Sequence, residues 1–407
     1  MPKKTATSKK ARHRHPTPDP AFALANSGVP DAAFRLTQAE GVRRLTAKVP
    51  AWAAVAGLIC PPRLALEQCS GEAAARYKAE QAKRLVPGGG VMADLTGGYG
   101  VDFAFLAPHF ARAIYVERQA GLCDVARHNF PRLGLAAAEI HQADGTALLD
   151  TLPALDLLYL DPARRDGAGR KTVLVSDCTP DVGQLLPRLT AKARVVMVKL
   201  SPMLDISRAI ETLRPAVAEV HVVAAGGECK ELLLVLRDVP TATPELFVAE
   251  GDTRLRLLFD DEAKATAPLA AAVGAYLYEP GAAVLKAGLF KWVAAHYGLS
   301  KLHPNTHLYT ADTVVSGFPG RAFRVAGVSG FSKAPLRALC AATPRANLAV
   351  RNFPGTVADL RRRLKVADGG EAYWFATTLA DGTHAIIDCR RLQHSPKDNN
   401  QHQSPSH

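Results

Sequence analysis

Short apolar runs alternate with stretches of helical periodicity between residues 91 and 238. Five runs read as strands, VMADL, AIYVE, AEIHQAD, DLLYLD and RVVMVKL, and helices are predicted near 101–111, 119–133, 179–192 and 204–214. Because strands that alternate with helices form parallel sheets with both faces covered, the pattern predicts an α/β fold. Two further runs, EVHVVAA and ELLLVL, are separated only by GGECK. That gap is too short for a helical crossover, so an antiparallel pair is predicted at the end of the sheet.

The pattern is helical before this region and mixed after it. From about 21 to 86 good helix formers dominate, with Ser70 predicted as an N-cap and Pro87 ending the last helix. Beyond residue 239 strand-like and helical segments follow one another less regularly, and a further unit begins at FRVAGVSGF. The C-terminal part is therefore predicted to be α+β.

The positive charge of the chain is unevenly distributed. The formal net charge is +12, and residues 1–20 hold six lysines and arginines against one aspartate, which places +5 in this tail and +7 in the rest. The prolines of the tail, and the polar composition of 394–407, predict disorder at both ends. The basic tail either attracts phosphate backbones or is a solubilising end, and charge alone leaves both interpretations open.

Several features favour a cytoplasmic protein. No run is long and apolar enough to span a membrane, and no apolar region follows the basic N-terminus as it would in a secretory signal. The seven cysteines are scattered without a CxxC pair, which is typical of free thiols in a reducing compartment. The spacing of His303 and His307 suits metal ligands, but Pro304 and Asn305 make the segment a turn, so no metal is expected.

Acidic residues recur at the carboxyl ends of the predicted strands. The first strand runs into the glycine-rich turn DLTGGYG, residues 94–100, and Glu117 ends the second strand. Asp144 ends the third strand and Asp161 the fourth. Carboxyl ends of parallel strands meet at one edge of the sheet, where ligands bind, so these acids are predicted to line one crevice.

The turn favours a particular kind of ligand. It has no GKS or GKT, which excludes a Walker phosphate loop, and it departs from the G-x-G-x-x-G pattern of NAD sites. An acid at its head suits a ligand with a cationic amino-acid end and no pyrophosphate. A carboxylate at the end of the second strand suits the two hydroxyls of a ribose.

This arrangement resembles the class I S-adenosylmethionine-dependent methyltransferases. The resemblance covers about 90–238 and implies a Rossmann-like, seven-stranded sheet that binds S-adenosylmethionine. In that family the first motif lies beside the amino-acid end of the cofactor, one acid binds the ribose, another contacts the adenine, and a fourth-motif acid faces the substrate. The matching residues are Asp94, Gly98 and Gly100 with Thr96 in place of the usual first glycine, then Glu117, Asp144 and Asp161.

A closer resemblance is to a bacterial group of these enzymes with an EQCS-like motif, here Glu67 to Ser70, before the methyltransferase domain. In this group a ferredoxin-like and a THUMP-like unit follow the methyltransferase domain, and THUMP domains bind RNA. The implied organisation is a disordered basic tail over 1–20, a helical segment over 21–86, the methyltransferase domain over 87–238, the ferredoxin-like domain over 239–325, the THUMP-like domain over 326–393 and a disordered tail over 394–407.

The substrate side of the site is predicted at the ends of the fourth and fifth strands. Asp161 and Pro162 match the start of the Asp/Asn-Pro-Pro-aromatic motif of amino-methylating relatives, but Arg164 replaces the aromatic residue. A guanidinium either stacks on a base or grips a phosphate, and both roles stay open. Lys199, inside the apolar run VVMVKL, is a further candidate because such a lysine is seldom exposed by chance. Cys178 is interpreted as a buried thiol, not a nucleophile.

These features predict a methyltransferase that acts on RNA. A basic helix, Arg361 to Lys365, is a candidate RNA contact or an ordinary solvated face. Two rivals remain open: a small-molecule or protein methyltransferase on the same scaffold, and a protein that binds the cofactor and RNA without catalysis. All three share the cofactor site.

Overall fold

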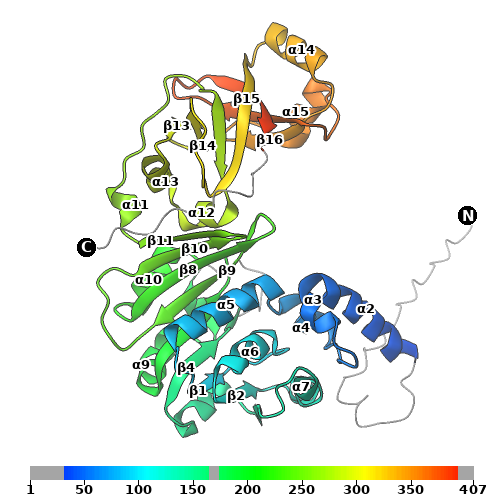
Figure 1. Ribbon diagram of the computed structural model, residues 1–407, viewed down its shortest axis with the longest axis vertical. Coiled ribbons are helices and arrows are strands. Elements are labelled where there is room, and N and C mark those ends of the chain that lie inside the picture. The colour runs from blue at the N-terminus through cyan, green and yellow to red at the C-terminus, as the bar shows by residue number, and fades with distance from the viewer. Residues whose placement is uncertain (1–31, 165–173, 393–407) are drawn as a thin grey trace, which may run out of the picture. The chain divides into compact units, whose positions relative to one another are not determined.

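The computed structural model describes residues 32–164 and 174–392 (Figure 1). Residue contacts divide the chain into two compact units, which are described separately. The first unit contains the residues up to 199, except 171–174, together with 236–238. The second unit contains 171–174 and all the other residues. The two predicted disordered tails, 1–20 and 394–407, lie outside the described residues.

The first unit opens with helices, as predicted. They are α2 (Ala32–Lys48), α3 (Pro50–Ala53), α4 (Arg63–Gln68) and α5 (Glu72–Leu85). Their apolar side chains share a core with the region after the first strand: Trp52 packs edge-on against Tyr99, with ring centroids 5.1 Å apart. The predicted N-cap is wrong. The N-cap of α5 is Gly71, and the Ser70 hydroxyl instead donates to a carboxylate described below.

A parallel sheet forms the centre of the first unit. Its strands run in the order β7-β4-β1-β2-β3, with each neighbouring pair parallel, as the alternating pattern predicted. The central strands β1, β4 and β7 are mostly apolar and buried because both faces are covered, whereas the edge strand β3 is largely polar. Their bounds are β1 (Val91–Asp94), β2 (Arg112–Glu117), β3 (Glu139–Gln142), β4 (Leu155–Leu160) and β7 (Ala193–Leu200), and the connecting helices are α6 (Val101–Leu106), α7 (Ala120–Arg132), α8 (Gly145–Leu148) and α9 (Val182–Lys192).

The second unit begins with α10 (Ile206–Leu213) and the neighbouring strands β8 (Val217–Ala225) and β9 (Glu228–Leu236). Gly226 and Gly227, both with positive φ, form the short connection between them. Two strands then follow, β10 (Glu245–Glu250), which pairs parallel with β8, and β11 (Thr253–Leu258), which pairs antiparallel with β10. The four neighbouring strands of this unit thus follow the order β11-β10-β8-β9.

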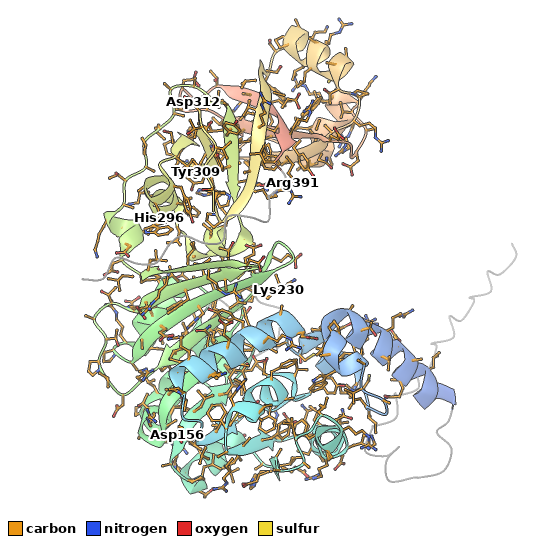
Figure 2. All side chains as sticks on the ribbon, in the orientation of Figure 1. Asp156, Lys230, His296, Tyr309, Asp312 and Arg391 are labelled. Atoms are coloured by element: carbon orange, nitrogen blue, oxygen red, sulfur yellow. The ribbon has the colours of Figure 1, made fainter. Side chains whose placement is uncertain are left out.

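A second mixed sheet occupies the C-terminal part of this unit. Its order is β13-β14-β12-β15-β18-β17-β16, and it confirms the predicted α+β class. Tyr309, labelled in Figure 2, is fully buried there, and its hydroxyl donates to the carbonyl of Phe290. The elements are α11 (Asp261–Lys264), β12 (Tyr276–Pro280), α12 (Ala282–Ala287), α13 (Phe290–Tyr297), β13 (Ser300–His303), β14 (Thr306–Ala311), β15 (Gly320–Gly330), α14 (Lys333–Ala342), β16 (Asn347–Arg351), α15 (Val357–Leu364), β17 (Ala372–Thr378) and β18 (His384–Arg391).

Candidate functional site

The glycine-rich turn leaves β1 and enters α6 with left-handed backbone at two positions. Gly98 has φ +56° and Gly100 has φ +83°, a region that favours glycine. A Cβ atom on Gly100 would lie 2.8 Å from the ring of Phe130, which belongs to α7. The turn therefore depends on glycine for both conformation and packing, and it leaves backbone close to the edge of the sheet where ligands bind.

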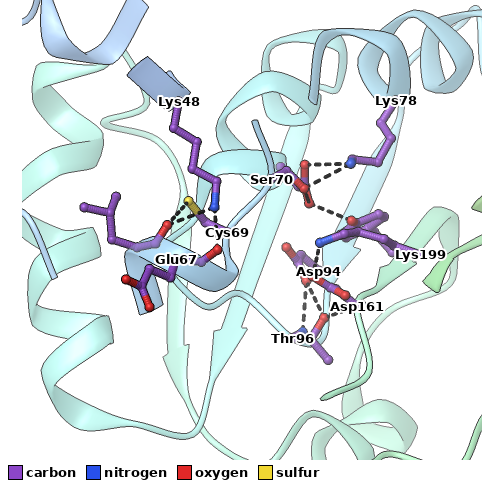
Figure 3. Close-up of polar contacts among 12 residues, drawn as sticks. Lys48, Glu67, Cys69, Ser70, Lys78, Asp94, Thr96, Asp161 and Lys199 are labelled. Carbon is purple, nitrogen blue, oxygen red and sulfur yellow. Dashed lines mark hydrogen bonds and ion pairs between the residues drawn. The ribbon is translucent and has the colours of Figure 1, made fainter. Parts of the chain in front are cut away.

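Thr96 links the ends of two neighbouring strands. Its backbone N–H and its hydroxyl both donate to Asp94 Oδ1, at 2.9 and 3.3 Å. The same hydroxyl accepts from the backbone N–H of Asp161 at 2.7 Å. Because β1 and β4 are adjacent and parallel, this side chain holds the first and fourth acids in fixed relation (Figure 3). Threonine in place of the family's first glycine thus has a structural function.

Asp94 is a buried carboxyl group that forms no ion pair with the residues that the structure describes. Only 1% of the residue is exposed, and the structure gives its Oδ2 atom no hydrogen bond from the described residues. Burial, together with the negative charges of Asp102 and Asp161, raises the pKa of Asp94 to about 8, against the hydrogen bonds from Thr96. A positively charged ligand group next to Asp94 would relieve this electrostatic cost.

Glu117 caps the backbone of the glycine-rich turn. One carboxylate oxygen accepts from the N–H of Gly98 at 2.9 Å, and the other accepts from the N–H of Gln119 at 2.8 Å. The residue ends β2, which pairs with β1, and it is buried. A carboxylate offers about four acceptor positions, so two remain for the hydroxyls of a ribose.

Asp144 has a structural function that the sequence analysis did not predict. Its side chain is the N-cap of the short helix α8 and accepts from the backbone N–H groups of Thr146 and Ala147. The Thr146 hydroxyl donates to the same oxygen at 2.6 Å and, with the backbone donors, holds the pKa of Asp144 below its usual range. The residue is exposed just beyond β3. Its contact with adenine stays a prediction.

Asp161 and Lys199 form an ion pair at the ends of β4 and β7. The Lys199 ammonium lies 2.5 Å from Asp161 Oδ2, and only 13% of the lysine side chain is exposed. The two strands are adjacent and parallel. Pro162 follows as a buried residue, and the backbone of Arg164 forms the two-residue strand β5 (Ala163–Arg164) with β6 (Cys178–Thr179). The side chain of Arg164 lies outside the described part of the structure.

A buried polar cluster that the sequence analysis did not predict lies close to these acids. Asp102, on α6, accepts from the Ser70 and Tyr159 hydroxyls at 2.7 Å each, both on Oδ2. The ammonium of Lys78 is 3.1 Å from Asp102 Oδ1 and 3.1 Å from the Ser70 hydroxyl. We call these four residues the Asp102 cluster, and Ser70 and Lys78 are labelled in Figure 3. Only the EQCS motif, which ends at Ser70, signalled it in the sequence.

One cysteine contacts a strand-end acid through the backbone, because the Cys123 thiol donates to the carbonyl oxygen of Glu117 at 3.2 Å. All seven carry free thiols, and Cys178 is buried as predicted. Burial raises the pKa of Cys69, in the EQCS motif, to about 11, so this thiol is protonated at neutral pH. No helix among the described residues combines the length and the apolar composition needed to cross a membrane.

Comparisons with known proteins identify the class to which this chain belongs. A crystal structure of a proposed methyltransferase from Porphyromonas gingivalis W83 is 35% identical in sequence, with a TM-score of 0.81 over 92% of this chain and 95% of that chain. Uncharacterized S-adenosylmethionine-dependent methyltransferases from two strains of Mycobacterium tuberculosis are 28% identical over 305 residues, which are 74% of this chain and 80% of theirs. Family models for a ferredoxin-like domain and a THUMP-like domain match residues 276–319 and 320–391.

The fold, the site and these relatives define the class of the protein as an S-adenosylmethionine-dependent methyltransferase. More narrowly, the chain belongs to the family of such enzymes that carry ferredoxin-like and THUMP-like C-terminal domains. The residues present suit the cofactor: Asp94 is a buried acid whose Oδ2 lacks a hydrogen bond from the described residues, and Glu117 retains free acceptor positions beside the glycine turn.

Proposed function

We propose that the protein transfers a methyl group from S-adenosylmethionine to RNA. The observation that carries the RNA assignment is the match of residues 320–391 to a THUMP-like family, because THUMP domains bind RNA. The enzyme class is established by the relatives, whereas the substrate rests on this match and on the charge of the chain. Seven free thiols support a reducing, cytoplasmic place of action.

In this proposal the first three strand-end acids hold the cofactor. Asp94 faces its cationic amino-acid end, Glu117 accepts from its ribose hydroxyls, and Asp144 contacts its adenine amino group. The turn at Gly98 and Gly100 brings backbone close to the ligand, with Thr96 fixing its first bend. When bound, S-adenosylmethionine supplies an electrophilic methyl group on a sulfonium.

Asp161 is the residue that we assign to the substrate. Its carboxylate is partly exposed, and it accepts a hydrogen bond from the amino or hydroxyl group to be methylated. The ion pair with Lys199 fixes the orientation of this carboxylate. Methyl transfer needs mainly this orientation and the exclusion of water, and the proton of the nucleophile passes to Asp161 as the new bond forms. Pro162 and the backbone of Arg164 form the edge of the substrate site next to Asp161.

Exposed cations of the THUMP-like part support an RNA partner. On α15 the side chain of Arg362 is 79% exposed, although it pairs with the also solvent-facing Asp359 at 3.0 Å, and Lys365, just after the helix, is exposed as well. Not every basic residue is available: Arg361 pairs with Asp368, and Arg351 pairs with the buried Glu279. The helix therefore combines internal ion pairs with cations that face solvent, and the latter are the candidates for phosphate contacts.

The test is the transfer of labelled methyl groups to RNA isolated from cells that lack the protein. Incorporation by the wild type, but not by Asp161→Asn, is the expected result. RNA binding should weaken in Arg362→Glu and should fall as salt rises. Incorporation into protein or small-molecule fractions instead of RNA would contradict the proposed substrate and favour the other methyltransferases of this scaffold. Cofactor binding without transfer to any fraction would indicate a protein that has lost catalysis.

A further inference from the structure

The Asp102 cluster connects the N-terminal helices to the strand that carries Asp161. Ser70 and Lys78 come from the EQCS motif and from α5, Asp102 comes from α6, and Tyr159 comes from β4. All four side chains are buried, and Lys78 has no exposed surface. All belong to the first unit. One carboxylate therefore joins three elements that are separate in the sequence.

Burying charged groups in such a cluster carries a cost in free energy. A buried ammonium and a buried carboxylate each lose hydration, and their mutual attraction often only offsets that loss. Anchoring the N-terminal helices does not require charges, because Trp52 and Tyr99 already join them to the glycine turn through an apolar core. Anchoring the helices therefore does not explain why the cluster contains charged groups.

The first connection to the site runs along β4. Tyr159 is two residues before Asp161, and side chains at such spacing point to the same face of an extended chain. The hydrogen bond from Tyr159 to Asp102 holds that stretch of backbone from one side. On the other side, the Thr96 hydroxyl accepts from the Asp161 N–H. The position of the Asp161 carboxylate thus depends on both contacts.

The second connection is electrostatic and involves Lys199. Burial opposes ionisation of Asp102, but the positive charges of Lys78 and Lys199 outweigh it and lower the pKa of Asp102. The same Lys199 ammonium is 2.5 Å from Asp161. Lys199 is therefore attracted by two carboxylates, and the charge of Lys78 decides how strongly Asp102 competes for it.

We propose that Ser70 and Lys78 are positioning residues for methyl transfer, acting through Asp102 and Tyr159 to hold Asp161 and Lys199 in their ion pair. The inference rests on the proposed role of Asp161 and gives the EQCS motif a function in the active site. Without the Ser70 hydroxyl or the Lys78 charge, Asp102 draws Lys199 away from Asp161, and the acceptor for the substrate loses its orientation.

The test uses Ser70→Ala, with Ser70→Thr as the variant that keeps the hydroxyl. Loss of one buried hydrogen bond should lower kcat about 10-fold in Ser70→Ala, while the affinity for S-adenosylmethionine by calorimetry stays within about 3-fold. Ser70→Thr should recover most of the rate. Lys78→Met should act in the same direction, and Lys83→Met, on the exposed side of the same helix, should behave as wild type. An unchanged kcat in Ser70→Ala would overturn the proposal.

A double-mutant comparison separates positioning from mere loss of stability. In the Asp161→Asn background, Ser70→Ala should cost less than about 2-fold in kcat, because the residue that it positions is already absent. An equal loss in both backgrounds would show independent effects and contradict the proposal.

Hydrogen exchange tests the cluster even if RNA is not the substrate. If the wild type transfers no methyl group to RNA, the proposed RNA substrate is wrong, but the positioning role of Ser70 can still be tested. Ser70→Ala should still raise exchange in the peptide covering 155–162, without raising it in α7, when S-adenosylmethionine is bound. Equal exchange of 155–162 in Ser70→Ala and the wild type would then overturn the proposal.

Discussion

Individual carboxyl groups in this enzyme differ sharply in environment although all lie near one edge of one sheet. Asp94 is buried among other acids, Asp161 is paired with a lysine, and Asp144 is an exposed helix cap. We propose that these environments give the three groups different tasks: attraction of a cation, orientation of a substrate and support of a loop. Strand-end position, which the sequence shows, does not distinguish these tasks.

Asp94 makes the stability of the cofactor-free protein depend on pH. Its pKa is raised from the usual value near 3.8 to about 8, chiefly by burial, so between these values the folded state holds a proton that the unfolded state lacks. Stability is therefore lost as pH rises through this range, by at most about 1.4 kcal/mol per pH unit from this group. The free energy of unfolding of Asp94→Asn should accordingly fall less than that of wild type between pH 5 and 8. Parallel curves from urea denaturation would contradict this account of Asp94.

Asp161→Asn should separate cofactor binding from catalysis. The amide preserves the size of the side chain but loses the negative charge that pairs with Lys199 and that we propose as the acceptor of the substrate proton. We expect affinity for S-adenosylmethionine within about 3-fold of wild type and a rate reduced about 100-fold. Asp150→Asn, an exposed carboxylate in the same unit, is the control and should retain full activity. A fully active Asp161→Asn would remove Asp161 from the mechanism.

At the scale of elements, the strand and helix pattern was predictable and some pairings were not. Apolar runs between turn residues identified the parallel strands, and GGECK identified the hairpin. The pairing of β10 with β8 was not predictable, because the partners are joined through β9 and a loop, and apolar periodicity does not specify a partner. The Asp102 cluster was missed for a similar reason: Lys78 and Asp102 lie on different helices with no periodic relation.

The glycine turn provides a test with a matched control. Gly100 and Gly134 have nearly the same φ, +83° and +80°, but a Cβ would meet the Phe130 ring only at Gly100, since nothing lies within 4 Å of it at Gly134. Both Gly→Ala changes carry backbone strain of about 1–3 kcal/mol. Gly100→Ala should lose about 1–3 kcal/mol more from overpacking and should weaken cofactor binding. Thermal unfolding and calorimetry of the two variants measure the difference, and equal losses of stability would be evidence against close packing at the turn.

At the scale of the whole molecule, a methyltransferase sheet is combined in one chain with a THUMP-like domain and a net positive charge. The cofactor class was implied in the sequence by the resemblance of the glycine-rich turn and the strand-end acids to class I methyltransferases. The methylated atom has no such signature here, since Arg164 replaces the aromatic residue by which amino-methylating relatives are recognised. Substrate identity therefore has to come from experiment.

The basic tail is testable through the salt dependence of RNA binding. Deletion of residues 1–20 removes a net charge of +5. If the tail contacts phosphates, the slope of log affinity against log salt should become shallower by up to about 0.7 for each charge removed. Filter binding across a salt series measures this slope, and an unchanged slope would identify the tail as a solubilising end.

The central claim, methylation of RNA at the Asp161 edge of the sheet, is tested most directly by mass spectrometry of methylated nucleosides in cellular RNA. RNA is compared from cells with the gene, without it, and complemented with wild type or Asp161→Asn. The account predicts that one methylated nucleoside disappears on deletion, returns with wild type and does not return with Asp161→Asn. An identical nucleoside profile in all four samples would contradict it.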